Sequence, residues 1–419
     1  MAQKRCRIYF KLKVLFLFLF IFSAPALGIE EDVILLDENI KEESAIKGYI
    51  ENSPYLLGDY KNFRTNLKEK GVDIQSSYII NSFVMKNNEK HSTKGTYQGL
   101  YNISADLDFE KMKLIKGGKF RILYQAGNKG MSSIDFLNTY SDMNSFNPTK
   151  SINQIGELYY EQSVMDDLIN LKIGKQDANT DFQALDTGFE FLNLSFSFID
   201  NTPMPLFPSQ QAGARLRLKL PLEIYVQDGF YDGNLETGAN SKSFFTGKNN
   251  YFNMAEIYKL TDFKGKQGKY LAGNWIKTGK YNSYKDKTER NNYGFYTGFD
   301  QKVLDRFEDK SGGLNIFGQF GYARNDINDV PYYYGIGAVF KGITEKRKED
   351  SIGIGFSLHQ FNRQLHKIEH KTAEKVIELF YKIKITEFLY IQPDIQYIIR
   401  PSGNEKNAFA IGLRTCITF

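Results

Sequence analysis

The segment Leu389-Tyr390-Ile391-Gln392-Pro393-Asp394-Ile395-Gln396-Tyr397 decides the fold class, because apolar and polar residues alternate along it. In an extended chain, one face would carry Leu389, Ile391, Pro393, Ile395 and Tyr397, and the opposite face Gln392, Asp394 and Gln396. Successive side chains of a β-strand point to opposite faces, so a period of two residues is typical of a strand. The segment therefore predicts a strand with one apolar and one polar face.

Segments of the same kind recur along the rest of the chain. Lys382 and Lys384 alternate with Ile383 and Ile385, and Arg215, Arg217 and Lys219 alternate with Leu216, Leu218 and Leu220. The alternating segments are 72–84, 97–109, 118–126, 153–163, 167–175, 210–220, 222–230, 250–260, 268–278, 290–299, 312–323, 332–341, 350–360, 375–386, 388–398 and 407–419. There are sixteen of them, and an even number is typical of bacterial outer-membrane barrels. We therefore expect an all-β protein, a transmembrane antiparallel β-barrel of 16 strands over residues 72–419.

The connections between these segments alternate between long and short. If the first strand runs outward from the periplasm, the extracellular links include 127–152, 176–209, 231–249 and 279–289, all long. The periplasmic links include 164–166, Pro221, 261–267 and Glu387, all short, although the links after 299 and after 341 are less regular. Long loops at one end and short turns at the other are typical of outer-membrane barrels. A soluble sandwich has no reason to produce this asymmetry.

Residues 1–26 are expected to be a signal peptide. A basic start is followed by the apolar run Val14–Phe22 and by the small residues Ala24-Pro25-Ala26, a pattern that favours cleavage after Ala26 or else after Gly28. The apolar run is too short to cross about 30 Å of hydrocarbon as a helix. We therefore expect export to the outer membrane of a Gram-negative-type cell.

Residues 27–71 are expected to form a periplasmic leader that contains a short helix. Within 59–71, Phe63 and Leu67 are spaced i, i+4 and Gly71 would end the helix. Residues 29–54 are acidic, and their apolar residues fit either an amphipathic helix or a mobile leader. Both interpretations of 29–54 remain open.

The charge balance argues against a nucleic-acid partner. The chain has 54 basic and 49 acidic residues, and five of the basic ones lie in residues 1–26, so the remainder is balanced. Cys6 lies in the signal peptide, which leaves Cys416 alone and excludes a disulfide within the mature chain. A large hydrogen-bonded barrel does not need one, whereas small exported domains often do.

The chain ends in Phe419, which follows an alternating segment. A terminal aromatic residue on the last strand is typical of proteins that are passed to the outer-membrane insertion machinery. We therefore expect this machinery and outer-membrane lipid as partners.

The stretch from Leu56 to Val72, LLGDYKNFRTNLKEKGV, resembles the opening signature L-x-G-D-W-G-G-x-R-x-x-L-x-x-x-G of the OprB family of carbohydrate-selective porins. Tyr60 replaces the tryptophan, and Lys61-Asn62 replaces the glycine pair. Further stretches that resemble the family are Gly156–Gln162, Ile173-Gly174-Lys175, Ile391–Tyr397 with Pro401, and Gly412-Leu413-Arg414. The resemblance covers about 55–419. It implies a 16-stranded barrel that admits carbohydrates by passive diffusion, with a pore narrowed by an inward-folded segment and by charged residues.

The selectivity of a passive channel depends on its width and on the hydrogen-bonding and charged groups that line it. The candidate pore-lining and substrate-binding residues are Glu157, Glu161, Arg215, Arg217, Asp394 and Arg414. Glu157 and Arg414 lie in stretches that resemble the family, and Arg215 and Arg217 are chosen on alternation alone. The alternative is that each is an ordinary charge in a wet lumen, neutralised by its neighbours.

The segment 176–209 is the candidate for the inward-folded constriction. It is long and carries Phe182, Phe189, Phe191, Phe196 and Phe198, which could pack inside the barrel. The alternative is an ordinary extracellular loop.

No motif predicts an enzyme, a cofactor or a metal site. Gly335-Ile336-Gly337 begins like a dinucleotide fingerprint, but Phe340 stands where the third glycine belongs. His366 and His370, with His359 nearby, are spaced like metal ligands but fall in a predicted loop rather than on a helix. The sequence also has no G-x-S-x-G nucleophile elbow.

Two alternative functions remain open. One is a general or anion-preferring diffusion porin without sugar selectivity, and the other is a secreted soluble β protein that binds glycans. Assembly of the barrel as a homotrimer is also open.

Overall fold

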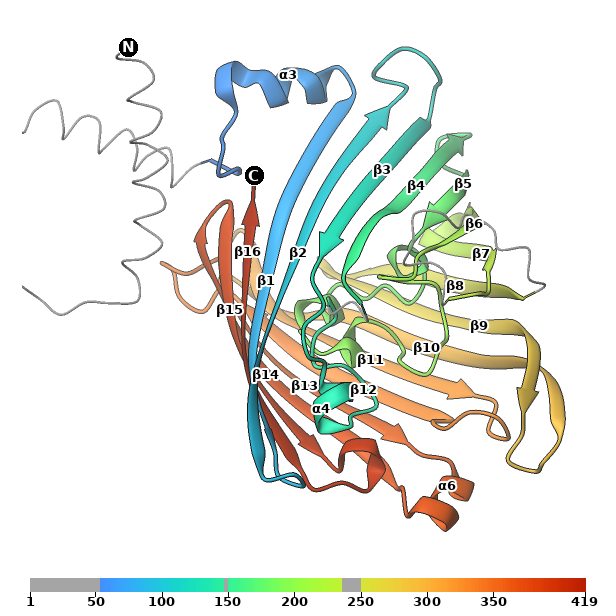
Figure 1. Cartoon of the computed structure of the whole chain (residues 1–419). Coiled ribbons are helices and arrows are strands. Elements are labelled where there is room, and N and C mark those ends of the chain that lie inside the picture. Colours follow the sequence, from blue (N-terminus) through green and yellow to red (C-terminus); the bar gives the residue numbers. More distant parts are fainter. Residues whose placement is uncertain (1–52, 147–149, 236–249) are drawn as a thin grey trace, which may run out of the picture. The chain divides into compact units, whose positions relative to one another are not determined.

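The computed structural model describes residues 53–146, 150–235 and 250–419. Within them, sixteen strands form a closed antiparallel barrel in which each strand pairs with its sequence neighbours and β1 pairs with β16 (Figure 1). The strands are β1 (Val72–Asn87), β2 (Ser92–Asp108), β3 (Gly118–Gly127), β4 (Ile152–Val164), β5 (Ile169–Gln176), β6 (Gln211–Leu220), β7 (Ile224–Asp232), β8 (Tyr251–Phe263), β9 (Lys266–Asn282), β10 (Thr288–Arg306), β11 (Gly312–Ala323), β12 (Tyr332–Lys341), β13 (Ser351–Gln360), β14 (Ala373–Thr386), β15 (Leu389–Ile399) and β16 (Ala408–Thr418). The predicted barrel and its strand number are confirmed.

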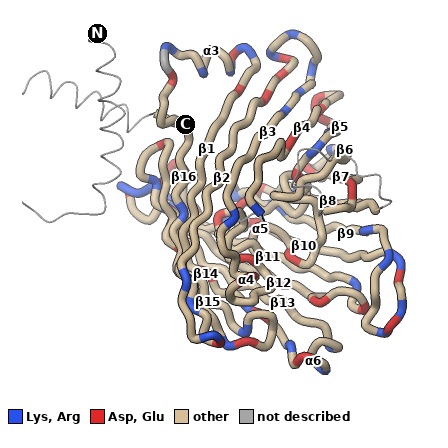
Figure 2. The backbone as a smooth tube through the Cα atoms, in the orientation of Figure 1, with Lys and Arg blue, Asp and Glu red and all other residues tan. Residues whose placement is uncertain are grey.

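The alternation along each strand separates an outer apolar face from an inner polar face. In β15, Gln392, Asp394 and Gln396 are buried inside the barrel, whereas Ile395 is 42 % exposed on the outside. An exposed apolar band is what an outer-membrane barrel presents to lipid. Figure 2 agrees with this, because charged residues gather towards the loops and turns and the middles of the strands carry few of them. This outer surface argues against a soluble glycan-binding protein.

The two ends of the barrel differ, as predicted, but two links are shorter than expected. We call the end that carries the links 128–151 and 177–210 the loop end, and the end that carries 165–168, 221–223 and 264–265 the turn end. The expected long link at 279–289 is only 283–287, because β9 and β10 extend towards each other around an irregular pairing near Arg290. The link after 299 is likewise only 307–311.

A short helix precedes the barrel, as predicted. The 3₁₀ turn η2 (Tyr60–Asn62) leads into α3 (Phe63–Glu69). Asp59 accepts hydrogen bonds from the backbone N–H groups of Arg64 (2.7 Å) and Thr65 (3.2 Å), which the helix start would otherwise leave unpaired. Gly71 then turns the chain into β1 with a φ of +90°, a conformation that favours glycine. The predicted signal peptide and the leader up to residue 52 lie outside the described residues.

Two long links fold into the barrel rather than over its rim. The link 128–151 contains α4 (Ser133–Leu137), and the link 177–210 contains η3 (Ala178–Thr180), η4 (Gly188–Glu190) and α5 (Leu194–Ser197) (Figure 1). The inward fold predicted for 176–209 is confirmed, and we call residues 177–210 the inner shelf. The inward fold of 128–151 was not predicted, because nothing in its composition distinguishes it from an ordinary loop.

The hydrophobic core lies inside the barrel, where the inner shelf meets the wall. Phe182, Phe191, Phe196 and Phe198 are buried as predicted, whereas Phe189 is 41 % exposed. The rings of Phe191 and Phe196 are 4.8 Å apart between centroids, and both pack against Phe317 of β11. Aromatic contacts of this kind hold the shelf in one position.

The position predicted for the histidines is partly wrong. His366 lies in α6 (Arg363–Glu369), and His370 ends that helix in a left-handed conformation. Asn362 starts the helix by accepting a hydrogen bond from the backbone N–H of Gln364 (2.9 Å), and an asparagine at this position is a helix-start signal in the sequence. His359 lies apart, buried in β13. None of the helices that the structure describes is long and apolar enough to cross a membrane.

Candidate functional site

The inner shelf is fastened to the wall by charged side chains from many strands. Buried groups bind it at intervals around the barrel: Lys172 to Asp181 (2.7 Å), Glu256 to the N–H of Gln183 (2.8 Å), Asp300 to the N–H of Thr187 (2.7 Å), Glu378 to the N–H of Leu192 (2.6 Å) and His359 to Asp200 (2.9 Å). Each contact joins the shelf to a different strand of the wall. The shelf is therefore a fixed partition inside the lumen, bound to strands β5, β8, β10, β13 and β14.

The wall of β2–β4 carries a second kind of charge, which faces the lumen. Arg121 donates from Nε to Glu157 (2.7 Å) and from one terminal nitrogen to both oxygens of Asp106 (2.8 and 2.7 Å). The strand register explains both contacts. Arg121 of β3 pairs directly with Asp106 of β2. Glu157 of β4 pairs with Leu123, which follows Arg121 by two residues and therefore lies on the same face of β3. The guanidinium side chain is 27 % exposed, so this bridge remains accessible to water and solutes.

Buried charges behind this bridge connect it to the shelf. Arg215 is 1 % exposed and lies 3.1 Å from Asp181 and 3.6 Å from Glu161. Burial acts to raise the pKa of Asp181, but the charges of Lys172 and Arg215 outweigh it and hold the pKa below its usual value. Arg217, the next lumen-facing residue on β6, pairs with Asp167 at 3.2 Å. We call Asp106, Arg121, Glu157, Glu161, Lys172, Asp181, Arg215 and Arg217 the charged wall.

The structure separates the predicted site residues into two groups. Glu157, Glu161, Arg215 and Arg217 lie in the charged wall, whereas Asp394 and Arg414 lie on β15 and β16. Arg414 donates to Asn81 (2.7 Å) and Asn144 (3.1 Å), and Asp394 accepts from Gln396 (2.9 Å).

Both Asp394 and Arg414 are buried, and Arg414 is covered by the inward link 128–151, with Phe146 4.5 Å away between the guanidinium and the ring centroid. All six side chains thus point inside the barrel, and their role in the pore stays a prediction.

Four residues of the charged wall were not predicted. Arg121 and Lys172 lie on alternating segments, between Phe120 and Ile122 and between Leu171 and Ile173, so the same alternation could have identified them. Asp106 ends a segment that alternates less clearly. Asp181 lies on the inner shelf, and only the folded path of that link brings it to β5 and β6.

The chain is similar to known proteins in both sequence and structure. Residues 92–419 match the model of the family described as "Carbohydrate-selective porin, OprB family". Porin B of Pseudomonas aeruginosa is 23 % identical over 424 residues, which cover 90 % of this chain and 93 % of that protein. Porin AaxA of Chlamydia pneumoniae is 22 % identical over 294 residues, 68 % of this chain and 62 % of that protein.

Solved structures show the same fold. The high-pH structure of Pseudomonas putida OprB superposes with a TM-score of 0.80 at 22 % identity and covers 88 % of this chain and all of that chain. The low-pH structure of Pseudomonas putida OprB has a TM-score of 0.60 at 19 % identity, with 88 % of this chain and 99 % of that chain covered. The family match does not include the opening stretch Leu56–Val72, but it spans nearly the whole barrel. The chain belongs to the carbohydrate-selective porin OprB family, and it is an outer-membrane channel that admits carbohydrates by passive diffusion.

Proposed function

We propose that carbohydrates pass along the exposed part of the charged wall on β2–β4, and that the charged wall favours neutral sugars over ions. The shelf is bound to β5 and β6 through Asp181 and to β8, β10 and β14 further round the barrel, so the wall of β2–β4 at the turn end is the side along which solutes would move. A cavity of about 280 Å³ opens on this wall at the turn end, beside α3, with Asp106, Arg121, Tyr159 and Glu161 among its lining residues and none from the inner shelf. This location next to the bridge of Arg121 is the observation that carries the proposal.

The charges of this wall suit a polyol better than an ion. The wall contains four basic and four acidic residues in fixed opposition, so it attracts neither sign strongly over distance. A sugar hydroxyl can donate to Asp106 or Glu161 and accept from Arg121, whose planar fork keeps its donors in place. A hydrated ion gains less, because it meets both signs and must shed part of its water.

The test is the selectivity of the purified channel with and without this bridge. Arg121→Ala should reduce the ratio of glucose permeation in liposome swelling to salt conductance in bilayers. The matched control is Arg324→Ala, an arginine that also pairs with two carboxylates, Glu289 and Asp326, but at the loop end. Its ratio should stay at the wild-type value. Equal permeation of sugars and of salts of the same size by the wild-type channel would instead favour a general porin.

We also propose partners for the outer surface and the last strand. The apolar outer face would contact outer-membrane lipid. Strand β16 would be presented to the insertion machinery, with Phe419 at its end donating its N–H to the carbonyl of Ser76 (2.8 Å). Assembly as a homotrimer stays a prediction, which the mass of the detergent-solubilised channel tests.

A further inference from the structure

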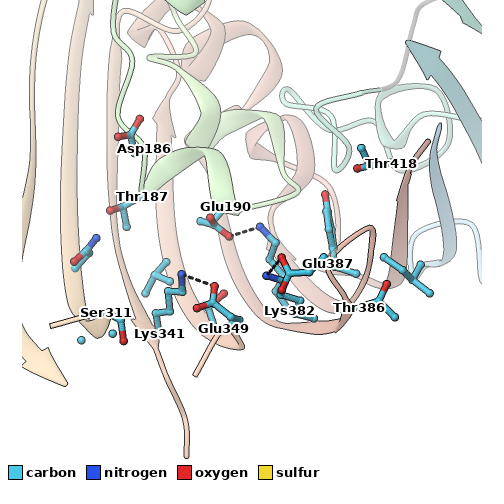
Figure 3. Close-up of a pocket in the computed structure, with 18 of the residues that line it drawn as sticks. Asp186, Thr187, Glu190, Ser311, Lys341, Glu349, Lys382, Thr386, Glu387 and Thr418 are labelled. Atoms are coloured by element: carbon cyan, nitrogen blue, oxygen red, sulfur yellow. Dashed lines mark hydrogen bonds and ion pairs between the residues drawn. The ribbon is translucent and has the colours of Figure 1, made fainter. Parts of the chain in front are cut away.

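A second cavity, of about 390 Å³, lies at the turn end of the barrel (Figure 3). Asp186, Thr187 and Glu190 of the inner shelf line one side, and strands β10–β16 with their turns line the other. The lining residues, all in the part of the chain that the structure describes, include none from the charged wall. The volume falls within the roughly 300–1,000 Å³ of small-molecule sites.

Three lysine–carboxylate pairs surround this cavity. Lys341 lies 3.0 Å from Glu349, Lys382 lies 2.9 Å from Glu190, and Lys384 lies 2.8 Å from Glu387 (Figure 3). The six side chains are between 28 and 47 % exposed, so each pair remains open to the solvent of the cavity. An ammonium carries three donors and a carboxylate about four acceptor positions, so a single contact leaves most of them unused.

Asp186 and Tyr390 add to this surface. Asp186 is exposed, and it has no ion-pair partner among the residues that the structure describes. Tyr390 contributes a ring, with the Nζ of Lys382 4.7 Å from its centroid. An aromatic ring packs against the C–H surface of a sugar, and a free carboxylate accepts from a hydroxyl.

We infer that this cavity is a second saccharide site, separate from the charged wall, in which ion pairs hold neighbouring hydroxyls of a neutral sugar. In each pair an ammonium donor stands beside a carboxylate acceptor. One hydroxyl of a vicinal diol donates to the carboxylate, and the next accepts from the ammonium. The inference rests on the proposed function, because the site would bind the same class of solute that the channel admits.

The lining charges select against ionised solutes. Lys302, Lys341, Lys382 and Lys384 are balanced by Asp186, Glu190, Glu349 and Glu387. An anionic sugar acid would have to compete with a carboxylate for its lysine. A neutral sugar leaves each pair intact and uses its spare donors and acceptors.

The test is current blockade in planar bilayers, with glucose or gluconate added to either side. We expect glucose to block the wild-type channel at lower concentration than gluconate. The double variant Lys341→Gln/Glu349→Gln keeps the net charge but removes one pair. It should raise the half-blocking glucose concentration about threefold to tenfold, the effect of losing one or two hydrogen bonds. The double variant Lys384→Gln/Glu387→Gln should raise the half-blocking glucose concentration by a similar factor. It replaces the first variant if that one does not fold.

The matched control is Lys219→Gln/Glu223→Gln, a pair 3.0 Å apart that does not line the cavity. Its half-blocking concentration should stay within about twofold of wild type, less than one hydrogen bond would change it. An unchanged block in the cavity variants, an equal shift in the control, or stronger block by gluconate would overturn the second site. Liposome swelling separates the two proposals: wild-type channels that exclude glucose refute both, whereas glucose entry with unaltered block refutes the second site alone.

Discussion

Replacement of Asp181 by alanine is expected to detach one edge of the inner shelf from the barrel wall. The carboxylate is bound by two cations that are almost fully buried, Lys172 at 2.7 Å and Arg215 at 3.1 Å. Loss of one partner from a buried ion pair costs about 3–5 kcal/mol, because the other charge stays buried without compensation. Residual contacts reduce that cost: Lys172 keeps Thr180 at 3.3 Å, and Arg215 keeps the carbonyl of Asn170 at 3.3 Å and Glu161 at 3.6 Å.

We therefore expect Asp181→Ala to lower the free energy of unfolding by about 3 kcal/mol, at the lower end of that range. The sixteen-strand ladder itself is untouched, so the barrel should still form. The loss should appear as a mobile shelf, with a larger and noisier single-channel conductance. Denaturant unfolding in detergent measures the first effect, and bilayer recording measures the second.

The control for this prediction is Glu223→Ala, which removes the acidic partner of an exposed pair with Lys219. Exposed pairs contribute little to stability. Both unfolding and conductance should therefore stay near wild type. If Asp181→Ala leaves the conductance unchanged, or costs no more stability than Glu223→Ala, the shelf is not held by this buried charge cluster and the reasoning is refuted.

Two further substitutions test the shelf from the opposite wall. Glu378→Ala removes the acceptor of the Leu192 N–H, and an unsatisfied buried donor costs about 1–3 kcal/mol. The midpoint of denaturant unfolding should therefore move to a lower denaturant concentration. An unchanged midpoint would show that the shelf rearranges without loss of stability. Gly355→Ala would place a Cβ 2.8 Å from the ring of Phe191 and should destabilise the protein by about 1–3 kcal/mol. The control Gly95→Ala, whose nearest contact would be 3.9 Å away, should leave stability unchanged. Equal stability of the two variants would contradict this packing.

The strands were predictable from sequence because the membrane imposes a simple rule on them. Outward residues such as Ile395 face lipid and inward residues such as Gln396 face polar groups, so every strand repeats the same two-residue pattern. The first and last residues of each strand were less predictable, because the rule does not apply to residues outside the apolar band. The extension of β10 to Arg306 shows this, because Asp305 and Arg306 continue the ladder without alternating in polarity.

The interior was only half predictable, for a different reason. The aromatic content of the inner shelf indicated that it folds inward, since Phe191 and Phe196 need an apolar partner. The link 128–151 has fewer aromatic residues, and it is held both by Phe136, Leu137 and Met143 in the core and by polar contacts such as Asn144 to Arg414. Those contacts join residues far apart in the chain. Only the closed barrel brings them together.

Fixed positions of the charged side chains are what would allow the charged wall to select among solutes. A flexible charge in a wet lumen would follow any passing ion, and it would discriminate weakly. Arg121 cannot do so, because Glu157 and Asp106 hold its guanidinium from two sides. Glu161 and Arg215 are held in turn by the buried cluster around Asp181. On the proposed function, the buried charges would matter to selectivity without touching the solute, since they fix the positions from which exposed groups would offer hydrogen bonds to it.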